Sequence, residues 1–124
     1  MSDTAHGDYA RYLPDIDVVD GVSRIMDNKK LYLSLLKKFK ARQMSEDLIN
    51  KINANEDPEQ ISQGAHAIKG AAGNLGLTRL SQTAIEIEAR IKNKEDCSDL
   101  VLPLNEALVS AERAIAELFE NEGV

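Results

Sequence analysis

Apolar residues recur at intervals of three and four along nearly the whole of this sequence. The clearest run is Ile61, Ala65, Ile68, Ala72 and Leu75, spaced four, three, four and three. That spacing puts every member on one face of an α-helix, whereas a strand would need alternation with period two. No segment alternates convincingly. The pattern therefore predicts an all-α protein built from amphipathic helices.

Capping and turn residues divide this pattern into five predicted helices. In chain order they are a short helix from Asp15 or Asp17 to Met26, a long one from Asn28 to Ile52, one from Asp57 to about 73–76, one from about Thr78 to Ile91, and one from Ser98 to Phe119. In the second helix the apolar stripe lapses after Phe39 and resumes at Leu48. This lapse allows a bend or local break near residues 44–47.

Four long amphipathic helices joined by short polar turns favour an antiparallel up-and-down four-helix bundle. Each helix must bury one stripe, and short connections make neighbouring helices antiparallel. The short first helix would then lie across one end. We expect residues 1–14 to form an N-terminal extension and residues 15–121 to form a single bundle domain. The start methionine and polar ends lead us to expect a complete small protein.

Charge and composition limit the partners and the compartment. The formal net charge is −6, which argues against broad nucleic-acid binding, and we interpret the basic cluster of residues 37–42 as a solvated helix face. No apolar stretch is long enough to span a membrane, and the opening residues do not resemble a signal peptide. A single cysteine, Cys97, cannot form an intrachain disulfide. We expect a cytoplasmic, monomeric protein that binds neither nucleic acid nor membrane.

The stretch GAHAIKGAAGNLG, residues 64–76, surrounds one histidine with glycine and alanine. At about 100° of rotation per residue, His66 lies roughly 140° from the apolar stripe and so points to water. The residues within about 60° of it on the helix surface are Ser62, Lys69, Gly70 and Gly73. A glycine inside a helix costs roughly 0.5–1 kcal/mol relative to alanine. Several glycines in one helix therefore call for a reason.

This arrangement suits a histidine that takes up a phosphoryl group. A neutral imidazole has a free lone pair for attack on phosphorus. Gly70 removes a Cβ that would crowd an incoming group, and the Lys69 ammonium stabilises negative charge that arrives on the ring. The spacing is equally compatible with an ordinary surface histidine beside glycines that permit close helix packing. We interpret His6, the other histidine, as part of a disordered N-terminal stretch.

The segment from Ala65 to Gly76 closely resembles the signature of histidine-containing phosphotransfer (HPt) domains of bacterial phosphorelays. It has their His-x-x-Lys-Gly core and later Asn-x-Gly. The resemblance extends from about Val18 to Leu118, and it implies a four-helix bundle that relays phosphate between aspartates of receiver domains. It also implies that Glu88 supports the other ring nitrogen of the histidine, although an ordinary solvated glutamate is as good an interpretation.

We therefore expect a phosphocarrier without ATP-dependent kinase activity. His66 would be the phosphoacceptor and Lys69 its electrostatic partner. Gly70 would leave space for the incoming group, and Glu88 would orient the ring. The predicted partner surface consists of Ser62, Gln63, His66, Lys69, Gly70 and Gly73. The resemblance implies a response-regulator receiver domain and a sensor histidine kinase as partners, with no cofactor or metal held by this chain.

Two alternatives to the phosphocarrier stay open at this point. A non-catalytic helical adaptor could dock a partner through the same small-residue face without any chemistry. A metal- or ligand-binding bundle enzyme has less support, because two distant histidines and one cysteine supply no ligand spacing. The chain could also have been excised from a larger sensor kinase.

Overall fold

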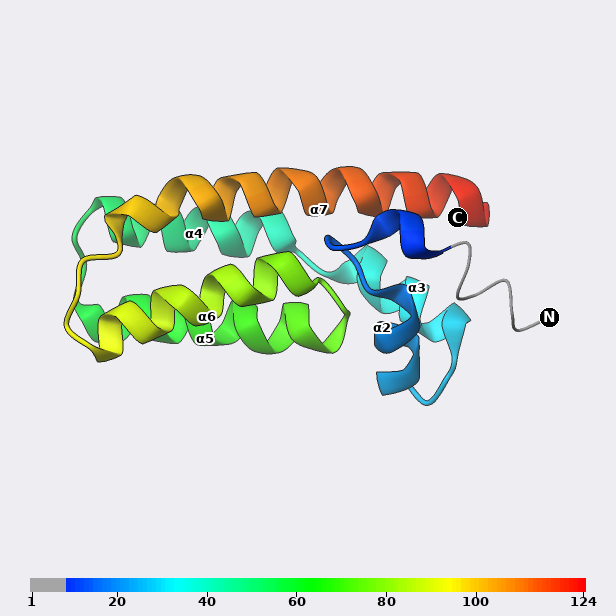
Figure 1. Ribbon diagram of the computed structural model, residues 1–124, viewed down its shortest axis with the longest axis horizontal. Helices are drawn as coiled ribbons and strands as arrows, with labels where there is room; N and C mark the ends of the chain where they lie inside the picture. Colours follow the sequence, from blue (N-terminus) through cyan, green and yellow to red (C-terminus); the bar gives the residue numbers. More distant parts are fainter. Residues whose placement is uncertain (1–8) are drawn as a thin grey trace.

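The computed structural model describes residues 9–124, and this part of the chain is helical without strands, which confirms the all-α prediction (Figure 1). The elements are η1 (Ala10–Tyr12), α2 (Val18–Arg24), α3 (Lys29–Lys38), α4 (Ala41–Asn53), α5 (Pro58–Asn74), α6 (Thr78–Lys92), η2 (Ser98–Leu100) and α7 (Val101–Glu122). None of these helices has the length and hydropathy needed to cross a membrane.

Four helices enclose the main core. Helix α5 packs against α4 and α6, and α7 packs against the same two helices, so that α4, α5, α6 and α7 lie side by side (Figure 1). The whole apolar stripe predicted for α5, from Ile61 to Leu75, is buried. It meets the buried faces of the other three helices, which carry Leu48, Ile52, Leu80, Ala84, Ile87, Leu104, Leu108, Ala111 and Leu118. Removing this apolar surface from water is the main stabilising contribution to the bundle.

Three of the predicted N-caps are confirmed by backbone hydrogen bonds to their side chains. Asp17, Asn28 and Asp57 accept from backbone N–H groups in the first turns of α2, α3 and α5. The prediction that Ser98 caps the last helix is wrong. Its hydroxyl lies against the Asp96 carboxylate, and α7 begins only at Val101. Pro103 then falls in the first turn, where a missing N–H is tolerated.

The second predicted helix is broken earlier than expected. Helix α3 ends at Lys38 and α4 begins at Ala41, whereas residues 44–47 lie inside a continuous helix. The buried face of α4 starts with two small residues, Ala41 and Ser45, which continue in phase to Leu48. The apolar positions therefore change phase between α3 and α4, where Phe39 has an extended backbone. The first helix also ends sooner than predicted, at Arg24 rather than Met26.

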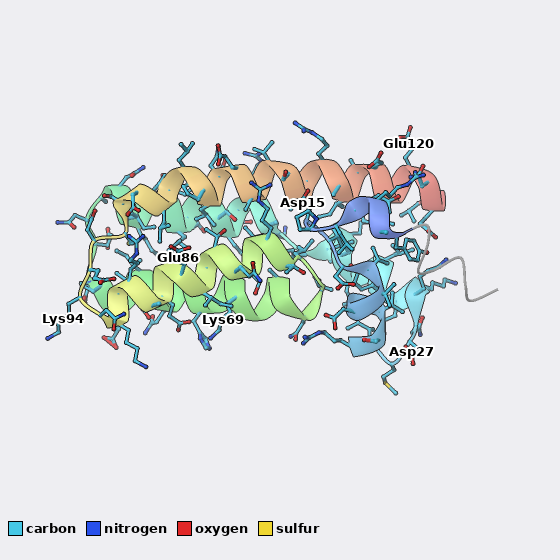
Figure 2. The ribbon with its side chains drawn as sticks, viewed as in Figure 1. Asp15, Asp27, Lys69, Glu86, Lys94 and Glu120 are labelled. Carbon is cyan, nitrogen blue, oxygen red and sulfur yellow. The ribbon has the colours of Figure 1, made fainter. Side chains whose placement is uncertain are left out.

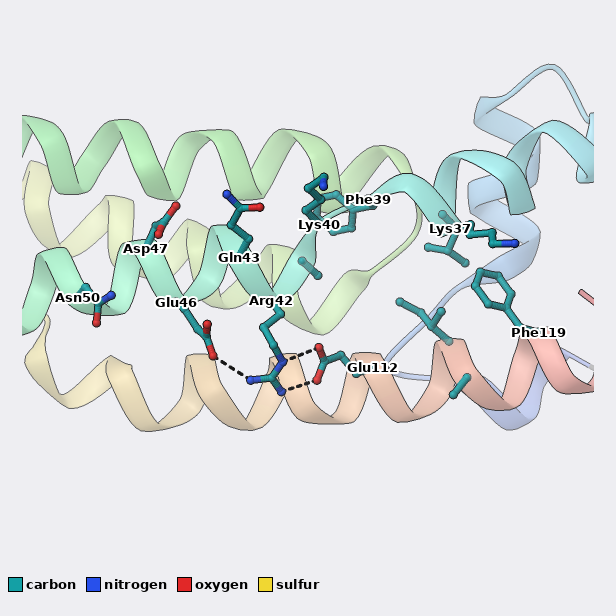
Figure 3. A pocket seen from close by; sticks show the side chains of 14 residues that line it. Lys37, Phe39, Lys40, Arg42, Gln43, Glu46, Asp47, Asn50, Glu112 and Phe119 are labelled. Atoms are coloured by element: carbon teal, nitrogen blue, oxygen red, sulfur yellow. Dashed lines mark hydrogen bonds and ion pairs between the residues drawn. The ribbon is translucent and has the colours of Figure 1, made fainter.

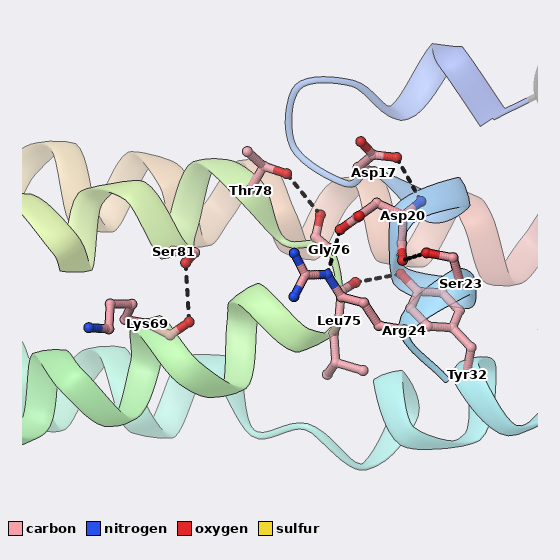
Figure 4. Close-up of polar contacts among 10 residues, drawn as sticks. All are labelled: Asp17, Asp20, Ser23, Arg24, Tyr32, Lys69, Leu75, Gly76, Thr78 and Ser81. Carbon is pink, nitrogen blue, oxygen red and sulfur yellow. Dashed lines mark hydrogen bonds and ion pairs between the residues drawn. The ribbon is translucent and has the colours of Figure 1, made fainter. Parts of the chain in front are cut away.

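Helices α2 and α3 lie at one end of the bundle, next to the turn between α5 and α6 (Figure 1). The buried Tyr32 hydroxyl donates to the Leu75 carbonyl at 2.7 Å, and the Asp17 N–H donates to the Gly76 carbonyl at 2.7 Å. The tyrosine contact joins α3 directly to the end of α5 (Figure 4). Gly76 has a left-handed φ of 74°. These contacts hold the end of the histidine helix in place.

The residues before α2 pack against the end of α7. Tyr12 and Ile16 are buried, and Asn121 donates to the Tyr12 hydroxyl at 2.7 Å. The Tyr9 hydroxyl donates to the Glu122 carboxylate at 2.8 Å. The described part of the predicted N-terminal extension is thus attached to the bundle, and His6 lies outside the described residues.

Candidate functional site

His66 lies near the middle of α5, on the face turned away from the core. Its side chain is 67% exposed, whereas its neighbours Ala65 and Ile68 are buried. The other residues of the predicted site come from the same face of α5 and from the adjacent α6. Side chains of this face, including Lys69, project from the surface of the bundle (Figure 2).

Glu88 of α6 joins the histidine to the lysine. One carboxylate oxygen, Oε2, lies 3.1 Å from His66 Nδ1, and the other, Oε1, lies 3.2 Å from Lys69 Nζ. Because His66 and Lys69 are three residues apart, they occupy neighbouring positions on one helix face. A single carboxylate on the next helix can therefore contact both. The structure brings together the three ionisable residues that the sequence analysis placed in the site.

The Glu88 carboxylate determines how the imidazole is presented. Burial alone would raise the pKa of Glu88, but hydrogen bonds from Lys69 and His66 outweigh burial and lower this pKa below its ordinary value. An ionised carboxylate can only accept hydrogen bonds, so the facing Nδ1 carries a proton. In the neutral ring, the free lone pair is then on Nε2.

The glycines of α5 have different roles. A Cβ on Gly64 would lie 3.2 Å from Leu48 Cδ1, and a Cβ on Gly73 would lie 3.3 Å from Ser81 Oγ. These two glycines therefore permit close approach of α4 and α6. A Cβ on Gly70 would have no other side chain, and no backbone outside its own helix segment, within 4 Å among the described residues. A Cβ at Gly64 or Gly73 would thus press against a side chain of the neighbouring helix, which would have to shift slightly, whereas a Cβ at Gly70 would meet open space.

A shallow hollow of about 390 Å³ adjoins the imidazole. It is lined by Glu59, Ser62, Gln63, His66, Ala67 and Glu88. Ser62 and Gln63 of the predicted partner surface border it, whereas Gly70 and Gly73 lie beyond His66 along α5. Sequence reasoning missed Glu59, although its position seven residues before His66, two helical turns away, could have indicated it.

A larger hollow of about 670 Å³ lies between the α3–α4 junction and α7 (Figure 3). Its lining includes Lys37, Lys40 and Arg42 of the basic cluster but none of the predicted site residues. Arg42 forms ion pairs with Glu46 and Glu112, so its charge is balanced within the chain (Figure 3). Among the described residues, no three histidine, cysteine or acidic side chains are grouped so as to hold a metal ion.

A family model described as the Hpt domain matches residues 37–120, which include α4, α5, α6 and most of α7. The chain belongs to the Hpt domain family. The resemblance carried by residues 65–76 is thereby confirmed. No match is found among curated proteins or among solved structures.

Membership of the Hpt family implies a histidine phosphotransfer role in two-component phosphorelays. Hpt domains are phosphocarriers rather than kinases, and they interact with receiver domains of response regulators and with kinase domains. This role matches the chemistry of the His66 imidazole, which contacts the Glu88 carboxylate on one side and is exposed on the other.

Replacing Glu88 by glutamine should destabilise the protein at neutral pH but not in acid. Because the folded-state pKa of Glu88 is lowered, its contribution to stability is present above the ordinary glutamate pKa of about 4.3 and is lost as the pH falls through the folded-state pKa. We expect Glu88→Gln to lower the free energy of unfolding by about 0.5 kcal/mol at pH 7, as for other partly exposed ion pairs.

Chemical denaturation of wild type and variant at pH 7 and at pH 3 measures this difference. Glu117→Gln, on the exposed surface of α7, is the matched control and should show little difference at either pH. A deficit in Glu88→Gln that persists unchanged at pH 3 would show that ionisation of Glu88 does not contribute.

Proposed function

We propose that this chain accepts a phosphoryl group on His66 and passes it to or from an aspartate of a response-regulator receiver domain. The observation that carries the proposal is the presentation of the ring. Nδ1 faces the Glu88 carboxylate at 3.1 Å, while the side chain is largely exposed and adjoins the open position at Gly70. Nε2 is then the nucleophile.

The transfer follows from these positions. The Nε2 lone pair attacks the phosphorus of the aspartyl phosphate, the N–P bond forms, and the P–O bond breaks with its electrons on the departing carboxylate. The ring gains positive charge, which the Glu88 carboxylate stabilises through the Nδ1 proton. Lys69 is a compact cation on a flexible stem, and it can turn from Glu88 toward the phosphoryl oxygens.

The proposed function belongs to one helical domain with antiparallel helices. The phosphotransfer domain would be residues 15–121, an antiparallel up-and-down bundle, with residues 1–14 as an extension and α2 as its short extra helix. The short connections at residues 54–57 and 75–77 support the antiparallel order. We also propose that the protein is a monomer in the cytoplasm. Its phosphoryl group would come from a sensor histidine kinase by way of a receiver domain.

Labelling with and without partners tests the function. The chain is incubated with radiolabelled ATP and Mg²⁺ alone, and separately with receiver domains that have been charged with radiolabelled acetyl phosphate. We expect no label from ATP alone and an acid-labile, alkali-stable label from at least one receiver. Label from ATP alone would contradict a carrier without kinase activity. A receiver that binds but transfers no label would favour the adaptor instead.

Gly70→Gln should slow transfer from a receiver domain by about tenfold without lowering stability. The larger side chain occupies the open space one turn from His66, and glutamine is a better helix former than glycine by several tenths of a kcal/mol. A melting temperature that is unchanged or higher is therefore expected. Single-turnover transfer measures the rate.

Labelling of the same variant by phosphoramidate, a small donor that needs little room, serves as the control. It should proceed at close to the wild-type rate. Transfer from the receiver at the wild-type rate would show that the space above Gly70 is not used by the partner.

A further inference from the structure

A large apolar side chain lies beside the histidine site and was not part of the predicted partner surface. Ile85 of α6 is 47% exposed. Within residues 9–124, it is the one large apolar residue exposed on α5 or α6, because Leu80 and Ile87 of the same helix are fully buried. The predicted surface contained only small, polar and charged residues.

The neighbours of Ile85 on α6 fix its position relative to α5. Glu88, three residues later, contacts Lys69 Nζ at 3.2 Å. Ser81, four residues earlier, donates to the Lys69 carbonyl at 3.1 Å, a contact that Figure 4 shows. Residues three and four apart lie on one side of a helix. Ile85 therefore lies between two residues that both touch the Lys69 turn of α5.

This position falls within the area that a protein partner of ordinary interface size covers when it reaches His66. Ile85 is about 4.5 Å along the helix axis from Glu88, which itself contacts the imidazole. A specific interface buries about 800 Å² on each partner, equivalent to a disc of roughly 16 Å radius. A receiver that brings its aspartate to Nε2 of His66 thus covers Ile85 as well.

We propose that Ile85 is the apolar anchor of the receiver-docking surface, and that it determines affinity for the receiver rather than the chemistry at His66. The proposal rests on the proposed function. The centre of an interface is apolar and depleted of charge, and a few well-buried side chains carry most of its binding energy. Lys69 and Glu88 form an ion pair beside the imidazole, so Ile85 is the large apolar side chain that α5 and α6 expose near these charged groups.

The position of Ile85 also predicts where the receiver should carry an apolar side chain. The axes of packed helices lie roughly 8–10 Å apart, so we expect Ile85 of α6 on the order of 10 Å from His66 of α5. The receiver should therefore carry an exposed apolar side chain roughly 10 Å from its phosphorylated aspartate. A receiver with only charged residues in that region should be a poor partner.

Ile85→Ser and Leu102→Ser form a matched pair for the test. Leu102 is also an exposed aliphatic residue, at 64%, but it lies on α7. The transfer rate is measured against the concentration of a phosphorylated receiver that wild type accepts. Ile85→Ser should raise KM by about tenfold with little change in kcat, whereas Leu102→Ser should match wild type. Thermal melting should be unchanged in both variants, because both side chains are exposed.

Other outcomes distinguish the anchor from the function. Wild-type KM in Ile85→Ser, or an equal loss in both variants, would overturn the anchor while leaving the phosphocarrier intact. Failure of wild type to take label from any receiver would overturn the proposed function and the anchor with it. Labelling of Ile85→Ser by phosphoramidate at the wild-type rate, together with the raised KM, would support an effect on docking alone.

Discussion

Replacing His66 by glutamine should abolish phosphoryl transfer and leave the fold intact. Glutamine offers no basic nitrogen with a free lone pair, so no N–P bond can form. The side chain is 67% exposed and contributes little to the core, so the free energy of unfolding should change by no more than about 0.5 kcal/mol. The expected result is complete loss of label with an unaltered melting curve.

Incubation with a receiver charged with radiolabelled acetyl phosphate measures the transfer. His6 remains in the His66→Gln variant, and His6→Gln provides the matched control, which should label like wild type. Label retained by His66→Gln, and lost in His6→Gln, would move the acceptor to the N-terminal stretch. Loss of label together with a lower melting temperature would show that His66 supports the fold as well.

The fold could be predicted wherever apolar side chains were large enough to mark a face. The stripe from Ile61 to Leu75 is buried along its whole length because each member follows the helical repeat. The break between α3 and α4 was placed about five residues too late. Ala41 and Ser45 are small enough to be buried without showing as part of an apolar pattern.

The site was predictable in its residues but not in their division of roles. The rotation of α5 indicates an exposed His66 with Lys69 beside it, because both lie on one helix. Glu88 lies on another helix, and only the resemblance to HPt domains suggested its place near the ring. Ile85 does not follow the helical repeat of Leu80, Ala84 and Ile87, so its exposure could be predicted, but its distance from His66 depends on how α5 and α6 pair. The different roles of Gly70 and Gly64 likewise depend on contacts between helices, because Gly64 faces Leu48 of α4 and Gly70 faces open space.

Gly76→Ala should lower the free energy of unfolding by about 2–4 kcal/mol, a large effect for a single methyl group. Gly76 has a φ of 74°, a conformation that costs an L-residue roughly 1–2 kcal/mol. A Cβ there would also be driven into the carbonyl oxygen of Asp17. That carbonyl cannot rotate away as a side chain could, because it accepts from the Gly21 N–H at 2.9 Å in the first turn of α2.

Gly123→Ala separates the two causes. Gly123 has the same φ of 74°, but a Cβ there would have no described neighbour within 4 Å. Gly123→Ala should lower the free energy of unfolding by about 1 kcal/mol or less, since Gly123 lies at the end of the last helix. Equal losses in the two variants, measured by urea denaturation, would show that the close approach of Asp17 adds nothing. A larger loss at Gly76 would show that the collision with the Asp17 carbonyl adds to the cost of the backbone conformation.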